Sequence, residues 1–184
     1  MSRRESGTAP GGGRRARPAG DPHVANVSGL LRVLDEGFDG RAWHGPNLMN
    51  SLRGVDTGLA SWRPGPDRHS IWELVLHAAY WKWTARKRIG AASGRFARPG
   101  SNFPAMPDDP DTAGWERDVQ LLRDEHAQLR AAVATLAPGS LLRKLGAEQR
   151  WTVEDTVRGV AFHDVYHAGQ IRLLKRLFEA ETHR

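Results

Sequence analysis

The longest helical pattern in this 184-residue chain lies near its C-terminus, from about residue 153 to 180. At roughly 100° per residue, apolar side chains from Val160 to Phe178 line up along the side of this helix that would face a core. His163, His167 and Gln170 fall in the middle of that apolar stripe, where Leu or Val would be expected. Buried imidazoles need polar partners, so this segment predicts a packed helix that encloses polar groups, and a shared metal ion would satisfy both histidines.

Other helical patterns precede this one, and no segment alternates polar and apolar residues as a strand would. The three longer helical patterns cover about 22–37, 70–89 and 114–136, and a short one covers 46–52. Ser70 with Glu73, and Thr152 with Asp155, form N-terminal capping pairs, and Asp21-Pro22 is typical of a helix start. We therefore predict an all-α fold with four main helices in one bundle.

Two connections interrupt the pattern, and a third irregular segment begins the chain. The stretch 56–69 is rich in Gly and Pro and is predicted to be a loop. The stretch 90–113 carries four prolines and no periodic pattern, which indicates a functional loop or a crossover between helices. Residues 1–20, rich in Arg, Gly and Pro, are expected to be a disordered tail before a single domain at 21–184.

Composition restricts the classes of function. The chain has no cysteine, which excludes disulfides, thiol nucleophiles and Cys-based zinc sites. Residues 1–22 hold five arginines against two acidic side chains, half of the net charge of +6, so the body lacks a nucleic-acid-binding surface. Without an apolar run of membrane-spanning length or a secretory signal, we expect a cytoplasmic protein. The aromatic-rich helix 70–89 could supply a homodimer face.

The helix at 70–89 offers a third histidine. It is apolar on nearly all sides except for one polar stripe, which carries Glu73, His77 and Tyr80. His77 alone would more often be a hydrogen-bonded core histidine, but the pair on the last helix favours a common metal site. Three neutral imidazoles with an open fourth position are typical of catalytic zinc, and imidazole also suits nickel, iron and copper.

Four other kinds of site share some of these features. His163-Asp164-x-x-His167 is similar to the His-Glu-x-x-His helix of zinc proteases, but Asp is shorter than Glu and points off the stripe. A di-iron site would need core-facing Glu-x-x-His pairs, which this chain lacks. A hydrogen-bonded histidine cluster without metal, and a closed site with His44 or His126 as fourth ligand, both stay open at this point.

The chain resembles the DinB/YfiT-like superfamily of metal-dependent helical bundles over residues 21–184. The resemblance rests on Trp43-His44-Gly45-Pro46, on the segment from Ser70 to His77, and on the segment from His163 to Ile171. It implies an up-down-down-up four-helix bundle, with a long crossover between the second and third helices. It also implies a divalent metal (Zn, Ni or Fe) held by His77, His163 and His167.

The resemblance also implies a class of reaction, because characterised members of the superfamily include thiol-dependent transferases and isomerases that use bacillithiol or mycothiol. We therefore expect a metal-activated thiol or water nucleophile that attacks a small electrophile. Glu73 could orient His77 or move a proton, Tyr80 and Gln170 could hold the ligand, and Trp43 and His44 could close the mouth of the site. The alternative is a non-catalytic metal-binding module with a binding or stress-response role.

Overall fold

A computed structural model describes residues 26–146 and 150–183, so the predicted disordered tail and the Asp21-Pro22 helix start lie outside the described part. Within these residues the chain is all-α, as predicted, with only an isolated bridge between Lys144 and Thr152. No helix among them is both long and apolar enough to cross a membrane. The elements are α1 (Val27–Phe38), α2 (Leu48–Ser51), α3 (Thr57–Ser61), α4 (Ile71–Arg88), α5 (Thr112–Ala134), η1 (Pro138–Ser140) and α6 (Val153–Thr182).

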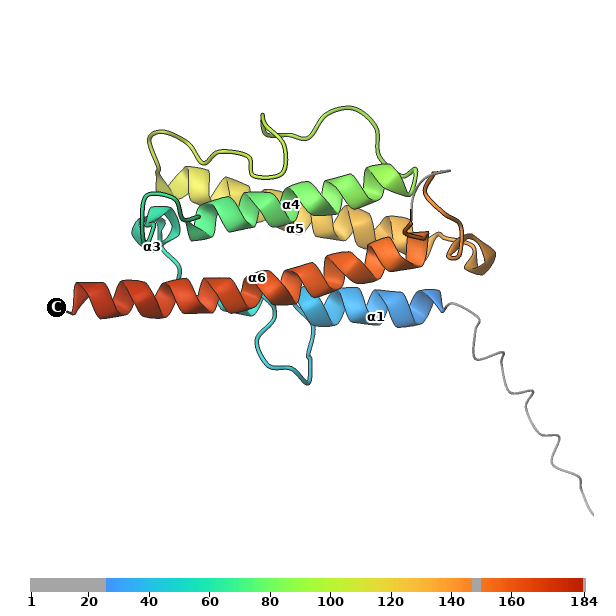
Figure 1. Ribbon diagram of the computed structural model, residues 1–184, viewed down its shortest axis with the longest axis horizontal. Coiled ribbons are helices and arrows are strands. Elements are labelled where there is room, and N and C mark those ends of the chain that lie inside the picture. Colours follow the sequence, from blue (N-terminus) through green and yellow to red (C-terminus); the bar gives the residue numbers. More distant parts are fainter. Residues whose placement is uncertain (1–25, 147–149, 184) are drawn as a thin grey trace, which may run out of the picture.

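The four long helices lie side by side. Helix α4 packs against α5 and α6, and α1 packs against the same two helices, so each long helix buries its apolar stripe on two others. In Figure 1, α4 and α5 run in the same direction, whereas α1 and α6 run in the opposite one. The connection at 89–111 returns the chain along the bundle between α4 and α5, which is the crossover that the sequence predicts.

Local capping explains where the helices begin. The predicted capping boxes of Ser70 with Glu73 and of Thr152 with Asp155 are both confirmed. Helix α1 begins later than predicted, because the Asn26 side chain accepts hydrogen bonds from the amides that follow it. Helix α3 lies in the stretch predicted to be a loop, where the Asp56 side chain caps it.

Helices α1 and α6 approach each other closely at Gly37. A Cβ atom at this position would lie 2.7 Å from the carbonyl oxygen of Ala161 on α6. Only glycine fits so near to another backbone, so Gly37 sets the distance between these two helices. Because Ala161 is two residues before His163, this contact also helps to fix the part of α6 that carries the histidine pair.

A buried ion pair lies inside the bundle. Lys82 of α4 forms an ion pair with Asp164 of α6, and both side chains are fully buried. The Lys82 Nζ atom lies 4.8 Å from the centre of the Phe38 ring, on which the His126 ring stacks at 3.7 Å. His126 is 5% exposed, and burial lowers its pKa to about 3.

Candidate metal centre

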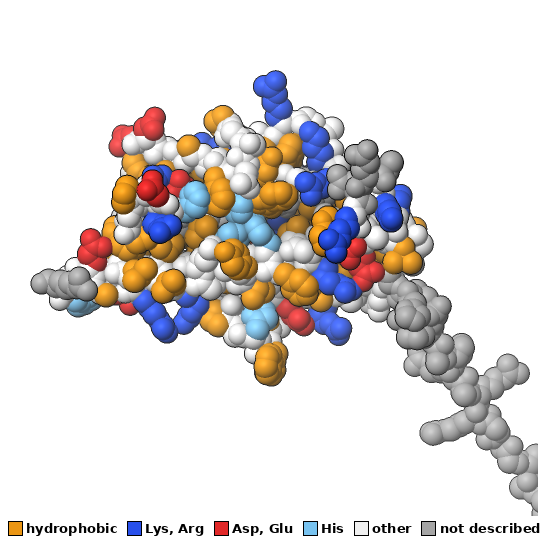
Figure 2. Space-filling view, in the orientation of Figure 1, with side chains coloured by type: hydrophobic (Ala, Val, Ile, Leu, Met, Phe, Trp, Pro, Cys, Tyr) orange, Lys and Arg blue, Asp and Glu red, His pale blue; other side chains and the backbone are white. Residues whose placement is uncertain are grey.

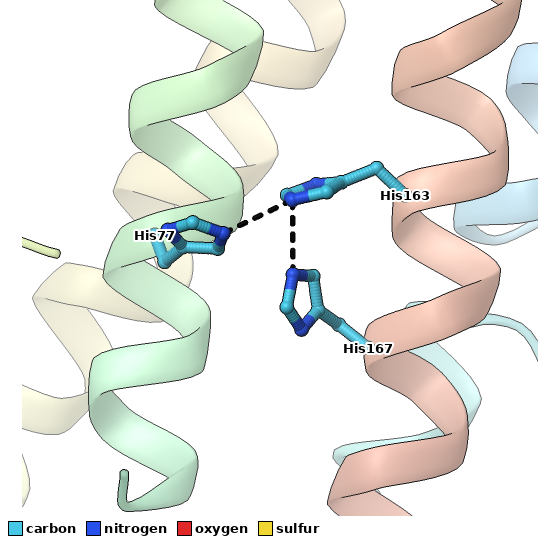
Figure 3. A group of neighbouring side chains, drawn as sticks. All are labelled: His77, His163 and His167. Atoms are coloured by element: carbon cyan, nitrogen blue, oxygen red, sulfur yellow. Dashed lines mark hydrogen bonds between the residues drawn. The ribbon is translucent and has the colours of Figure 1, made fainter. Parts of the chain in front are cut away.

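The three predicted histidines meet between α4 and α6. The Nε2 atom of His163 lies 3.0 Å from Nε2 of His77 and 2.9 Å from Nε2 of His167. Figure 3 shows the three rings turning these nitrogens toward one another across the gap between the two helices. Among the described residues this is the group of side chains that could hold a metal ion, with its ligand atoms within 4.8 Å of one another. We refer to His77, His163 and His167 as the three-His site.

Two of the rings are oriented by hydrogen bonds from their other nitrogen. The Nδ1 atom of His77 lies 2.6 Å from the backbone carbonyl oxygen of Asn102, and Nδ1 of His167 lies 2.6 Å from Oε1 of Gln170. Each of these oxygens can only accept, so each Nδ1 carries the ring proton. The Nε2 atoms of both rings are therefore left with a lone pair that points into the site, as metal-ligating histidines require.

The number of ring protons at the three Nε2 atoms favours a cation between the rings. Nε2 of His163 makes two short contacts with lone pairs, but a neutral ring can place at most one proton there. One of the two contacts would then bring lone pairs together without a proton between them. A divalent ion accepts all three lone pairs at once, so the donor set suits a metal better than a histidine cluster alone.

Burial keeps the three rings neutral. Desolvation lowers the pKa of His163 to about 3 and that of His167 to about 4, and in His163 the nearby imidazoles of His167 and His77 add to the effect. The pKa of His77 is also lowered, mainly by burial, although its hydrogen bond to Asn102 opposes the shift. At neutral pH all three therefore have lone pairs free for a metal ion.

A cavity of about 810 Å³ opens beside the three-His site and is lined by all three of its members. Both apolar and polar side chains line this cavity. The lining includes Phe103, Leu173, Leu174 and Leu177, and also Arg68, His69, Tyr166 and Gln170. In the space-filling view histidine side chains are visible near the centre of this face, with hydrophobic side chains around them (Figure 2). A small molecule could therefore reach the histidines from solvent.

Several predicted site residues lie elsewhere. Trp43 and His44 are exposed on the connection between α1 and α2, and neither lines the cavity, so the structure does not bring them to its mouth. Glu73 does not orient His77, because its carboxylate accepts from the Ser70 amide at 2.8 Å and from Arg63 at 2.7 Å. Tyr80 packs among aromatic rings and does not line the cavity. Of the residues predicted to lie around the histidines, Gln170 is the one that forms a hydrogen bond with a member of the three-His site.

The residues that orient and cover His77 come from the crossover between α4 and α5. Asn102 has a φ of 61°, in the left-handed region that Asn tolerates, and this conformation accompanies the turn of its carbonyl toward His77. Phe103 stacks on His77 at 3.8 Å and on His69 at 3.8 Å, forming a column of three rings. The sequence contains one signal for this, the long connection without a periodic pattern, but nothing in it selects Asn102.

One of the comparisons with known proteins identifies a family for the chain. The sequence model of the DinB superfamily matches residues 42–171, a span that contains all three histidines. No curated protein and no solved structure matches the chain. Because the matched span covers more than half of the sequence, the chain belongs to the DinB superfamily.

Proposed function

We propose that the chain is a metal-dependent enzyme that joins a thiol, or water, to a small electrophile, in the manner of a thiol transferase. His77, His163 and His167 would hold a divalent ion such as zinc, nickel or iron through their Nε2 atoms. When bound, such an ion lowers the pKa of a thiol or a water molecule and so supplies a nucleophile at neutral pH. The observation that carries the proposal is the convergence of three Nε2 atoms at the wall of a cavity.

The chain's own residues prepare the site. Asn102 and Gln170 keep the protons of His77 and His167 on Nδ1, which holds both rings in the orientation that a ligand needs. Phe103 covers the face of His77 and excludes water from it. His69, at the far end of that ring column, also lines the cavity and is exposed, so a substrate in the cavity can contact its ring.

The alternative of a non-catalytic metal module is less well supported. A structural metal site is closed by four protein ligands. The group found among the described residues has three members, and His126, which could have been a fourth, stacks on Phe38 instead. The cavity beside the three histidines leaves room for a substrate at the remaining position.

We also infer the up-down-down-up order of the four long helices. The parallel run of α4 and α5 in Figure 1, with the crossover between them, supports this order. This order matters for the site, because the long crossover that it requires carries Asn102 to His77. A short hairpin between α4 and α5 would not reach His77.

A turnover assay tests the proposal. The metal-loaded protein is incubated with an aryl halide and, in turn, with cysteine, glutathione, bacillithiol or mycothiol, and product formation is followed by absorbance. We expect turnover with at least one thiol, its loss in His163→Ala, and retention in His126→Ala, which removes a buried histidine outside the site. Full metal occupancy together with no turnover for any thiol or for water would favour the binding module.

A further inference from the structure

A second, smaller recess adjoins the three-His site on the other side of His163. Its volume is about 260 Å³, and its walls include Trp81 and Arg88 of α4, Trp151 just before α6, and Val160 of α6. His163 lines both this recess and the larger cavity. A molecule in the recess would therefore extend directly to the candidate metal ligand. We call this space the tryptophan recess.

Two indole rings give the recess its apolar character. Trp81 is held in place, since its Nε1–H donates to Oδ1 of Asn102 at 3.0 Å. Trp151 is 52% exposed and lines the recess, so part of its indole ring is open to a ligand. Indole faces interact best with planar rings in stacked or edge-to-face geometry, so the recess favours an aromatic group.

The charge around the recess is positive. The Arg88 guanidinium lies 5.4 Å from the centre of the Trp81 ring, and that of Arg150 lies 5.1 Å from the centre of the Trp151 ring. Neither arginine forms an ion pair within the described residues. Asp155 also lines the recess, and hydrogen bonds from the amide and hydroxyl of Thr152 lower its pKa, so its carboxylate stays ionised and sets one negative charge against the two arginines. An anionic group would find free guanidinium donors here.

We propose that the tryptophan recess binds the planar, anionic part of the substrate, an aromatic carboxylate, with the ring between the indoles and the carboxylate on Arg88. The volume is close to the lower end of ligand pockets, about 300 Å³, so it suits one or two fused rings and not an entire cofactor. The description of this ligand as part of a substrate rests on the proposed function. Its binding to the recess does not.

Titration calorimetry with 2-naphthoate tests the proposal on the full chain, both metal-loaded and metal-free. We expect saturable binding with one ligand per chain in both forms. Naphthalene-2-methanol, which keeps the ring but not the charge, and cyclohexanecarboxylate, which keeps the charge but not the planar ring, should each bind about tenfold more weakly or worse. Arg88→Met and Trp151→Ala should weaken naphthoate binding to a similar extent. Arg172→Met, at an exposed arginine of α6 that does not line the recess, should stay within about twofold of the parent.

The outcomes separate this proposal from the proposed function. Binding that fails in both forms, or that Arg88→Met leaves unchanged, overturns the recess as an aromatic carboxylate site. Binding seen only with metal and independent of Arg88 places the carboxylate on the metal, which contradicts the recess and leaves the proposed function standing. Arg88-dependent binding to a protein that takes up no metal even on reconstitution supports the recess and removes the proposed function. Thermal melts followed by circular dichroism check that Trp151→Ala is folded before its binding is compared with that of the parent.

Discussion

His77 donates its Nδ1 proton to the backbone carbonyl of Asn102, over a distance of 2.6 Å. This bond links the metal-facing lone pair of His77 to the conformation of the crossover, because Asn102 has a φ of 61°. Partners that orient a metal-ligating histidine contribute strongly to metal affinity, so residue 102 should control the site without touching the metal.

Changing Asn102 to Val should therefore weaken metal binding. A β-branched residue does not adopt this φ readily, so the carbonyl would turn away and metal affinity should fall about 10- to 100-fold. Asn102→Gly is the matched control, since it keeps the conformation and loses only the side-chain bond to Trp81. Competition with a coloured chelator measures both affinities. Equal affinities for the Val and Gly variants would show that the carbonyl does not orient His77.

Removing one partner of the buried ion pair should destabilise the fold. Lys82→Met leaves the Asp164 carboxylate buried and unpaired, and should cost about 3–5 kcal/mol in the free energy of unfolding. Adding Asp164→Leu should recover most of that loss. The exposed pair of Arg130 with Asp35 provides the comparison, where Arg130→Met should cost at most about 1 kcal/mol. Urea unfolding measures all four proteins, and similar losses for Lys82→Met and Arg130→Met would contradict the burial argument.

A methyl group at Gly37 should push α1 away from α6. The added Cβ would lie 2.7 Å from the Ala161 carbonyl oxygen, so Gly37→Ala should cost about 1–3 kcal/mol of stability. Gly159→Ala on α6 is the control, because a Cβ there meets nothing within 4 Å and alanine favours helix. Thermal melts should therefore shift in opposite directions for the two variants. An unchanged melting temperature for Gly37→Ala would show that the helices can separate without cost.

Stability of the metal-free protein should fall as the solution is acidified. Folding lowers the pKa of His126 to about 3, chiefly by burial, so between about pH 6.5 and pH 3 the unfolded chain binds more protons than the folded one. The free energy of unfolding then decreases with falling pH, by up to about 1.4 kcal/mol per pH unit for each such histidine. His126→Phe should reduce this slope in urea titrations with chelator present. An unchanged slope would mean that His126 becomes protonated within the fold.

The parts of the fold that depend on local chemistry were predictable from the sequence. The two capping boxes mark the starts of α4 and α6, because a cap needs only residues within one turn. Likewise, the i, i+4 spacing of His163 and His167 fixes their common side on any helix. The polar stripe that carries His77 follows from the same periodicity.

The partners of these residues could not be predicted, because they depend on how distant segments meet. Lys82 and Asp164 form a pair only once α4 and α6 adopt their relative rotation, and Asn102 belongs to a segment without periodicity. Glu73 was assigned to His77 from its one-turn spacing, but its carboxylate serves the cap and Arg63 instead. Trp43 and His44 lie in a connection whose direction no local pattern determines.

Elemental analysis of the purified and metal-reconstituted protein tests the central claim most directly. The account predicts one divalent ion per chain in the parent and in His126→Ala, and substoichiometric metal in His163→Ala and His77→Ala. A parent protein that holds no metal after reconstitution, or a His163→Ala variant that retains one ion per chain, would contradict it.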